Sequence, residues 1–395
     1  MTDTEKARPL DGIQVLDLTT TIAGPYCARL LADLGAAVIK VEGPEGDMTR
    51  DRPPLRAGSS TSYGQLNAGK RSIALDLKQP AGQEAMRRLV ADADILVENY
   101  RPGIMARFGL GYDALSQLNP KLIYCAISGY GQTGPSATLA AYAPAIHAAS
   151  GYELAHLAYQ EGRKRPDNCG IYTADVLSGT YAFGAVMTAL VQRHATGLGQ
   201  MIDVSMLETM LGLTLTEVQL GQFPQPPSGK PLFGPVATSD GYIMPAIASE
   251  RTFQNLARAV GREDWITDLR FRVYLDRRAN WGALIDELEL WTATRTSVEC
   301  QAAMDATGVP CSPYRKVGDL FDDPQLAHRN AFAEVQDAGG TFRVVNPPFR
   351  MSAATTSVNN FVTALGENTR DILSEAGYGP DEIEAMISSG AARAV

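Results

Sequence analysis

A regular alternation of short apolar runs and helical segments over about the first 210 residues limits the fold of this chain most strongly. The runs that read as strands are 15–18, 36–42, 72–77, 95–98, 122–127 and 201–204. Helical segments lie between them, among them 80–93, which starts on a proline. Strands separated by helices predict an α/β fold with a doubly wound, mostly parallel sheet.

In such a sheet, ligands bind beyond the carboxyl ends of the strands. The loops expected at those ends carry polar, aromatic and basic side chains suited to a ligand: Thr20, Thr21, Asn99, Tyr100, Arg101, Gly129 and Tyr130. We therefore expect the functional site at this edge of the sheet.

The composition changes after about Leu220. Residues 221–235 hold five prolines and indicate a linker or an ordered loop. The organisation we expect is a large α/β domain over 1–220, a linker with a smaller α+β domain over 221–317, and a tail over 318–395. The tail contains a predicted strand at 342–345 and helices at 368–376 and 381–389.

Asp175 is the strongest catalytic candidate. It stands at the start of a predicted buried helix, 176–194, where the backbone N–H groups and the helix dipole stabilise a carboxylate. An aspartate that only caps the helix, without any catalytic role, would show the same sequence pattern. The small residues Ser178, Gly179 and Thr180 predict open space beside the acid, and a carboxylate beside a cavity can attack a reactive acyl group.

Composition excludes several functions. The net charge of −9 argues against general nucleic-acid binding. The five cysteines form no C-x-x-C pair and predict free thiols in a reducing cytoplasm. The four histidines lack metal-ligand spacing, so we expect no metal. No apolar run approaches membrane-spanning length and the start of the chain does not resemble a signal peptide, so we expect no membrane contact.

Two stretches resemble nucleotide-binding motifs, but each lacks residues that the motif requires. The turn after the first strand reads TTTIAGP where a dinucleotide site needs G-x-G-x-x-G, so no nicotinamide cofactor is expected. Residues 64–70 (GQLNAGK) fit most of a phosphate-binding loop. Arg71 follows, however, where a Ser or Thr must reach magnesium, and a strand follows instead of a helix.

Three blocks of the sequence carry a family resemblance: 9–50, 66–103 and 174–208. They begin PLDGIQVLDLTTTIAGP, LNAGKRSIALDLKQP and ADVLSGTYAFGAVMT, and they resemble the family III coenzyme A transferases in the same order. That family includes formyl-CoA transferase and carnitine CoA-transferase, and the 2-methylacyl-CoA racemases are relatives. The resemblance implies an interlocked homodimer, no tightly bound cofactor, and acyl-CoA and a carboxylic acid as substrates.

The resemblance also implies roles for individual residues. Asp175 falls on the family's nucleophile, which attacks a donor acyl-CoA and then carries CoA as an aspartyl thioester. Tyr142 matches an active-site tyrosine; its alternative role is an amphipathic core tyrosine. The positions that match CoA-binding residues are Thr21, Ile22, Ala23, Leu77, Lys78, Asn99, Tyr100 and Arg107. For Lys78 and Arg107 the alternative is an ordinary solvated surface charge.

The chain departs from formyl-CoA transferase at three places. Ile22 stands where that enzyme has a glutamine, Ala140 stands near its active-site lysine, and 226–235 lacks its run of glycines. Groups suited to a small dianion are therefore missing. We expect a larger or more apolar acyl chain, a mono- or dicarboxylate with succinyl-CoA as the donor.

Two other functions stay open. A 2-methylacyl-CoA racemase needs two proton-transfer groups on opposite faces of a carbon. Tyr142 stands where the racemases have a histidine, and a tyrosine with a pKa of about 10 is a poor base. His147 lies about one and a half helical turns further on and is expected to face elsewhere. The third function is a CoA-binding subunit without chemistry, against which Asp175 argues.

Overall fold

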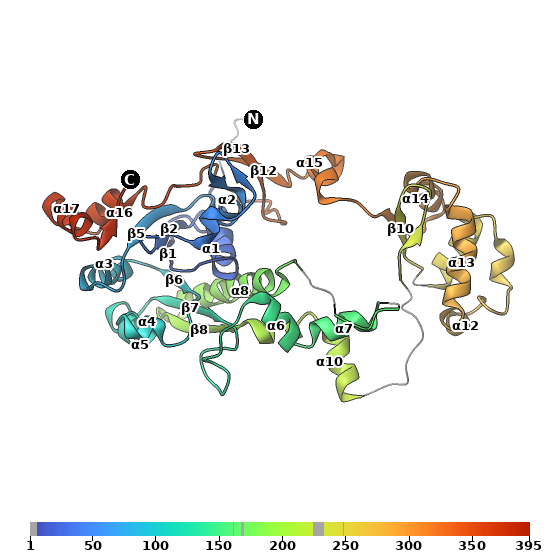
Figure 1. Cartoon of the computed structure of the whole chain (residues 1–395), viewed down its shortest axis with the longest axis horizontal. Coiled ribbons are helices and arrows are strands. Elements are labelled where there is room, and N and C mark those ends of the chain that lie inside the picture. The colour runs from blue at the N-terminus through green and yellow to red at the C-terminus, as the bar shows by residue number, and fades with distance from the viewer. Residues whose placement is uncertain (1–5, 161, 167–169, 224–232, 248) are drawn as a thin grey trace. The chain divides into compact units, whose positions relative to one another are not determined.

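The computed structural model describes residues 6–160, 162–166, 170–223, 233–247 and 249–395 (Figure 1). Cys169 and residues 224–232, which make up most of the proline-rich segment 221–235, lie outside the described residues. The chain forms two compact units. The first comprises 1–154, 167–215 and 324–395, and the second comprises 155–166 and 216–323.

The first unit is built on a seven-stranded sheet of order β14-β5-β2-β1-β6-β7-β8. Six strands pair in parallel and β14 pairs antiparallel with β5. The strands are β1 Gln14–Asp17, β2 Ala37–Glu42, β5 Arg71–Leu75, β6 Ile95–Glu98, β7 Ile123–Ser128, β8 Gln200–Ser205 and β14 Ala392–Arg393. The strand order reverses between β1 and β6, the place where a crevice for a ligand forms in such sheets.

The expected mixed α/β architecture with a mostly parallel sheet is therefore confirmed. The strand β5 ends at Leu75, two residues earlier than the sequence predicted. The chain turns at Asp76, whose N–H bonds to Ala391 and whose carbonyl accepts from Gln79. Leu77, which the sequence places in the strand, thus lies in the turn before α3.

Helices cover both faces of this sheet (Figure 1). One face packs against α1 Ala23–Asp33, α6 Ala143–Ala149, α8 Thr173–Thr196 and α9 Met206–Leu211. The other face packs against α3 Pro80–Ala91, α5 Tyr112–Leu118, α16 Thr369–Glu375 and α17 Pro380–Ser388. Alternate residues of each strand enter the two cores, as the period-two pattern of a strand requires.

The C-terminal segment packs on the start of the chain. β14 lies beside β5, and the hairpin of β12 Phe332–Asp337 and β13 Gly340–Val345 contacts α2 Thr61–Asn67. Arg29 of α1 donates to the carbonyl of Val345 at 3.1 Å and pairs with Asp33. Figure 1 shows this return as red and orange ribbon beside blue. Three short elements complete the unit: β3 Leu55–Arg56, β4 Ser59–Ser60 and α4 Ile104–Arg107.

The second unit has its own core of large side chains, including Phe253, Trp265 and Leu288. Its antiparallel sheet consists of β9 Val236–Ala237, β10 Tyr242–Pro245 and β11 Cys311–Pro313. Its helices include α10 Leu215–Gln222, α11 Glu250–Ala259, α12 Tyr274–Ala279, α13 Trp281–Thr292 and α14 Ser297–Thr307. α7 Tyr152–Ala158 and α15 Pro324–His328 lie at the boundaries between the two units.

The helix α8 is long and apolar. Within the described residues it is the one helix long and apolar enough to cross a membrane by length and composition. Its buried residues, among them Ala174, Gly179 and Val186, form one face that packs on α1 and the sheet. The helix is not an unbroken apolar run, but its opposite face also carries apolar side chains such as Tyr181 and Val191.

Candidate active site

Asp175 lies in the first turn of α8, as expected, but it is not the N-cap. The helix begins at Thr173 with Tyr172 as its N-cap, so Asp175 is the third helical residue. Burial raises the pKa of its carboxyl group to about 6, and a hydrogen bond from the backbone N–H of Ala23 acts in the opposite direction. The acid is therefore partly desolvated and faces the start of α1.

The small residues that follow Asp175 do not leave the open space we expected. A Cβ on Gly179 would lie 2.5 Å from the carbonyl oxygen of Ala23. Ser178 donates to the carbonyl of Ala174 at 2.6 Å and its hydroxyl lies 2.9 Å from that of Thr209. These residues are small because α1, α8 and α9 approach closely here, and this contact brings Ala23 to Asp175.

The loop that leads to Ala23 is held in an unusual conformation. Thr21 has a positive φ of 66°, which costs energy for a β-branched residue. Its N–H donates to Asp47 at 3.1 Å. The amide of Asn99 exchanges two hydrogen bonds of 2.9 Å with the backbone of Thr20. The loop is thus fixed from two sides, by the segment after β2 and the segment after β6.

A buried network of charged side chains forms hydrogen bonds with the backbone of this loop and of the start of α1. The ammonium group of Lys40 donates to the carbonyl of Thr19 and lies 3.6 Å from Asp47 and 3.8 Å from Asp17. Lys70 donates to Asp17 at 2.8 Å and to the carbonyl of Pro25 at 2.9 Å. Burial would raise the pKa of Asp17, but the two ammonium groups outweigh it and lower that pKa. Burial lowers the pKa of Lys70 to about 8.

This network explains the motif at 64–70. Lys70 resembles a phosphate-binding lysine in sequence, but it is fully buried and bonded to Asp17, Asn67 and Pro25. The rejection of a nucleotide-hydrolysis site there agrees with this placement. Sequence reasoning missed the network itself, although one signal was present: Lys40 interrupts an otherwise apolar strand.

The residues expected to bind CoA follow three parallel strands of the sheet; β1 and β6 are neighbours, and β2 separates β5 from β1. Ile22 and Ala23 lie after β1, Leu77 and Lys78 after β5, and Tyr100 after β6. Leu77 is buried, whereas the side chain of Lys78 is exposed. Glu98 accepts a hydrogen bond of 2.8 Å from the N–H of Tyr100, and burial raises the pKa of Glu98 to about 7.

Lys78 and Arg107 are the exposed cations of this group. Arg107 ends α4 after β6. Within the described part of the chain, neither charged side chain forms an ion pair. Both are therefore available to an anionic ligand at the carboxyl edge of the sheet.

Tyr142 precedes α6 as its N-cap, His147 lies in the last turn of this helix, and the two side chains differ in exposure. Tyr142 is the N-cap and is 68% exposed, whereas His147 is fully buried. The sequence-based expectation that the two face different ways agrees with this. His147 nevertheless reaches the start of α8, because its Nε2 accepts a hydrogen bond of 3.0 Å from the N–H of Ala174. Spacing along α6 gave no signal of that contact.

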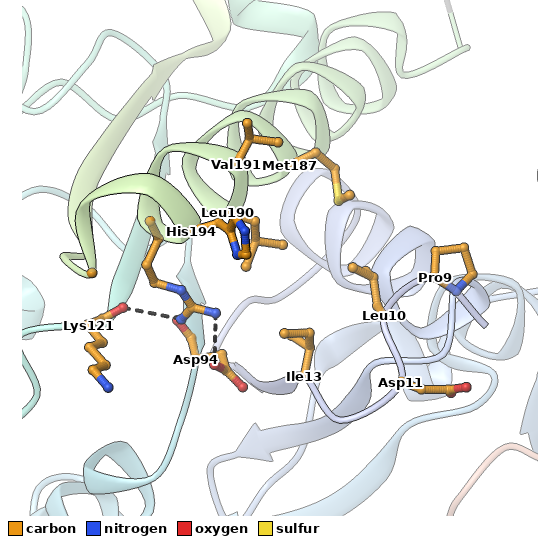
Figure 2. Close-up of a pocket in the computed structure, with 12 residues that line it drawn as sticks. Pro9, Leu10, Asp11, Ile13, Asp94, Lys121, Met187, Leu190, Val191 and His194 are labelled. Carbon is orange, nitrogen blue, oxygen red and sulfur yellow. Dashed lines mark hydrogen bonds and ion pairs between the residues drawn. The ribbon is translucent and has the colours of Figure 1, made fainter. Parts of the chain in front are cut away.

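A large cavity of the first unit lies away from these residues (Figure 2). It measures about 660 Å³ and is lined by apolar side chains such as Leu10, Ile13 and Leu190. Two of its charged side chains form an ion pair, since Arg193 lies 2.9 Å from Asp94. The cavity lies against the last turns of α8, whose lining residues are roughly 18–28 Å along the helix axis from Asp175. It lies apart from the candidate site around Asp175.

Comparison with known proteins gives the family. The model of CoA-transferase family III matches residues 10–369. Succinyl-CoA:glutarate CoA-transferase of Mus musculus is 33% identical over 98% of this chain and 91% of its own length. The chain belongs to CoA-transferase family III.

Other members of the family agree. Formyl-CoA:oxalate CoA-transferase of Escherichia coli O157:H7 is 31% identical over 96% of this chain and 98% of its own. A solved structure of a CAIB/BAIF family protein from Brucella suis is 34% identical, with a TM-score of 0.83 over 94% of this chain and all of its own. The resemblance found in the sequence is confirmed, and this family III member is an enzyme that transfers CoA between an acyl-CoA and a carboxylate.

Proposed function

We propose that Asp175 is the nucleophile of this CoA-transferase. One carboxylate oxygen attacks the carbonyl carbon of the donor acyl-CoA, the C–S bond breaks, and a mixed anhydride and CoA thiolate form. The thiolate then attacks the aspartyl carbonyl and releases the donor acid, which leaves CoA on Asp175 as a thioester. The acceptor carboxylate attacks this thioester, which expels the CoA thiolate and forms a second mixed anhydride. The thiolate then attacks the acceptor carbonyl of that anhydride, and Asp175 leaves as a carboxylate.

The environment of Asp175 carries this proposal. A carboxyl group with a pKa of about 6 is ionised at neutral pH and is more nucleophilic than a solvated carboxylate. The N–H of Ala23 faces the same carboxyl group, where it can stabilise the oxyanion of each tetrahedral intermediate. Burial also limits the access of water, which hydrolyses both the anhydride and the thioester.

The exposed cations give the proposed position of CoA. Its phosphates bind Lys78 and Arg107, and its pantetheine arm follows the loops of Asn99, Tyr100 and Thr21 toward Ala23 and Asp175. Ionised partners make such hydrogen bonds strong. A protein with a net charge of −9 needs local cations of this kind to hold an anion. Tyr142, exposed beside this region, is assigned to contact the acyl group.

The substrates we propose are a succinyl-CoA donor and a mono- or dicarboxylate acceptor. Relatives that match almost the whole chain are named for succinyl-CoA with glutarate or D-citramalate. Ile22 and Ala140 supply an apolar lining instead of groups for a small dianion. No metal, nicotinamide or tightly bound cofactor is needed, since CoA itself is the transferred group. The described cysteines are unpaired, which agrees with the cytoplasm as the location.

We propose a homodimer whose chains interlock. In the first unit, large apolar side chains near the first three turns of α8 and the end of α9 are exposed in the single chain: Ile171, Tyr172, Val176, Tyr181, Leu211 and Leu213. Apolar side chains that a protein interface covers are exposed in this way in one isolated chain.

A covalent adduct on Asp175 tests the transferase mechanism. Incubation with succinyl-CoA and no acceptor leaves CoA on the peptide that contains Asp175, and borohydride or hydroxylamine changes the mass of that peptide. Asp175→Asn binds CoA but loses transfer by several orders of magnitude, because the amide cannot attack. Asp175→Glu also fails, since one more methylene displaces the oxygen by about 1 Å. Rapid transfer by the Asn variant, or an adduct on another peptide, contradicts the proposal.

Racemisation of a 2-methylacyl-CoA is the second candidate and the buried state of His147 opposes it. A racemase base must reach the α-carbon of the substrate, whereas Nε2 of His147 is engaged with Ala174. Exchange of the α-proton in deuterated water, without any acceptor acid, separates the two functions. A transferase shows no exchange of the α-proton under these conditions.

A further inference from the structure

The N-terminus of α8 has no cap of its own. Tyr172 occupies the N-cap position, and its side chain accepts no hydrogen bond from the helix. The first N–H groups of a helix lack partners within the helix, and a polar N-cap side chain usually accepts from the second or third of them. Here the second, that of Ala174, donates instead to Nε2 of His147 at 3.0 Å. A histidine of α6 therefore caps α8.

This cap requires a neutral imidazole with its proton on Nδ1, since Nε2 must accept. The tautomer is assigned from this hydrogen bond. His147 is fully buried, and its Nδ1 lies 3.7 Å from a carboxylate oxygen of Glu153. The ring of Tyr152 packs on the other side, with ring centroids 5.7 Å apart. Among the described residues Nδ1 has no hydrogen-bond partner, so the bond from Ala174 to Nε2 is the one hydrogen bond that orients the ring.

The capped residue is the neighbour of the proposed nucleophile. Ala174 is completely buried, and its carbonyl accepts from Ser178, whose hydroxyl meets Thr209 of α9. One chain of hydrogen bonds thus joins α6, the first turn of α8 and α9. A shift of Ala174 moves Asp175 relative to the N–H of Ala23.

We propose that His147 is a positioning residue for Asp175, which holds the first turn of α8 in the reactive geometry and does so only while its imidazole is neutral. The inference rests on the proposed role of Asp175 as the nucleophile. A proton on Nε2 would place two N–H groups against each other and a positive charge at the positive end of the helix dipole. Protonation therefore releases the cap.

The charged groups around His147 agree with a neutral ring at neutral pH. Burial lowers the pKa of His147, and Glu153 of α7 opposes this effect. The acids on the other elements packed against α6 are Asp175 of α8 and the exposed Glu208 of α9. Neither forms an ion pair with the ring.

The test compares His147→Gln, whose amide oxygen can accept at the place of Nε2, with His147→Leu, which has no acceptor. The measurement is the rate of aspartyl-CoA formation in a single turnover, with kcat and KM for succinyl-CoA. We expect His147→Leu to lose about 10- to 100-fold in this rate and in kcat with KM within about twofold, because misplacement by about 1 Å has this effect. His147→Gln restores most of the rate. His194→Gln, at the far end of α8, is the matched control and behaves as wild type.

The pH profile gives a readout that a merely structural role would not change. In the wild type, Asp175 and His147 must both lose a proton, so log kcat/KM falls with a slope of two at low pH. In His147→Gln the slope is one, and this measurement stands even if His147→Leu does not fold. Equal slopes in both proteins, or full activity of a folded His147→Leu, overturn the inference. A wild type that forms no adduct at Asp175 instead overturns the proposed function.

Discussion

The carboxylate of Asp175 is less stable in the folded protein than in water, because burial removes hydration that no cation replaces. Its raised pKa means that the native state binds the proton more tightly than the unfolded state does. This acid therefore lowers the free energy of unfolding as pH rises from its ordinary value of 3.8 to about 6, and the loss is complete above that range.

Removal of this charge should stabilise the protein. We expect Asp175→Asn to raise the free energy of unfolding at pH 7 by roughly 2–3 kcal/mol, with the gain disappearing below about pH 4. Urea denaturation of both proteins at a series of pH values measures this difference in the free energy of unfolding. Asp286→Asn, at an exposed position in the middle of α13, is the control and should change stability little at any pH. A destabilised Asp175→Asn at pH 7 would contradict the buried, unpaired state of this acid.

The two exposed cations of the site allow a second test at this scale. Loss of Lys78 or Arg107 should weaken CoA binding by about 1.5–3 kcal/mol, because each removes one charge-assisted contact to a phosphate. Binding of pantetheine, which has no phosphate, should not change. Lys121→Ala is the matched control, since Lys121 is also exposed but precedes β7 at the opposite edge of the sheet. Equal weakening of CoA and pantetheine would remove the phosphate assignment.

The sequence was sufficient to place Asp175 in the first turn of a helix, since helical spacing is a local property; its catalytic role stays a prediction. It was not sufficient for the contacts of His147, Lys40 and Lys70. Each of these side chains binds a partner from a distant part of the chain, as Lys70 does with Asp17. A buried polar side chain needs such a partner, but periodicity cannot say which residue supplies it.

At the scale of elements, the site depends on the close contact of α1 and α8. The sequence predicted both helices and most strands to within a few residues, because their apolar patterns are regular. The same patterns suggested that small residues near Asp175 leave a cavity, and this was wrong. Small side chains allow either a cavity or a close approach of two helices, and only the partner helix decides between them.

Substitutions of Gly179 and Gly184 in α8 test whether the close contact of α1 and α8 matters. A methyl group on Gly179 meets the carbonyl of Ala23, which cannot move without the loop, whereas one on Gly184 meets nothing within 4 Å. We expect Gly179→Ala to destabilise the protein by about 1–3 kcal/mol and to lower kcat by displacing Ala23 from Asp175. Gly184→Ala should stabilise by about 0.5–1 kcal/mol without loss of activity. Thermal unfolding and kcat check both; an active, stable Gly179→Ala contradicts the role of this contact.

At the scale of the whole molecule, the apolar side chains that the first unit leaves exposed raise the question of what covers them. The described residues bury one face of α8, although the helix is apolar nearly all round. A helix of that composition is normally surrounded on all sides. The sequence alone could predict such a helix but not its remaining partner, because hydrophobic patterning does not distinguish the inside of one chain from an interface between two.

A second copy of the chain is the cover we expect, and sedimentation velocity tests it. The wild type should sediment as a dimer down to nanomolar concentration, because interlocked chains cannot separate without unfolding. Tyr181→Glu, half-exposed on α8, should weaken the dimer and lower activity, since it introduces a charge into an apolar interface. Leu118→Glu, similarly exposed on α5 across the sheet, is the matched control and should leave the dimer intact. A compact, fully active monomer at nanomolar concentration would mean that the exposed face of α8 serves another purpose.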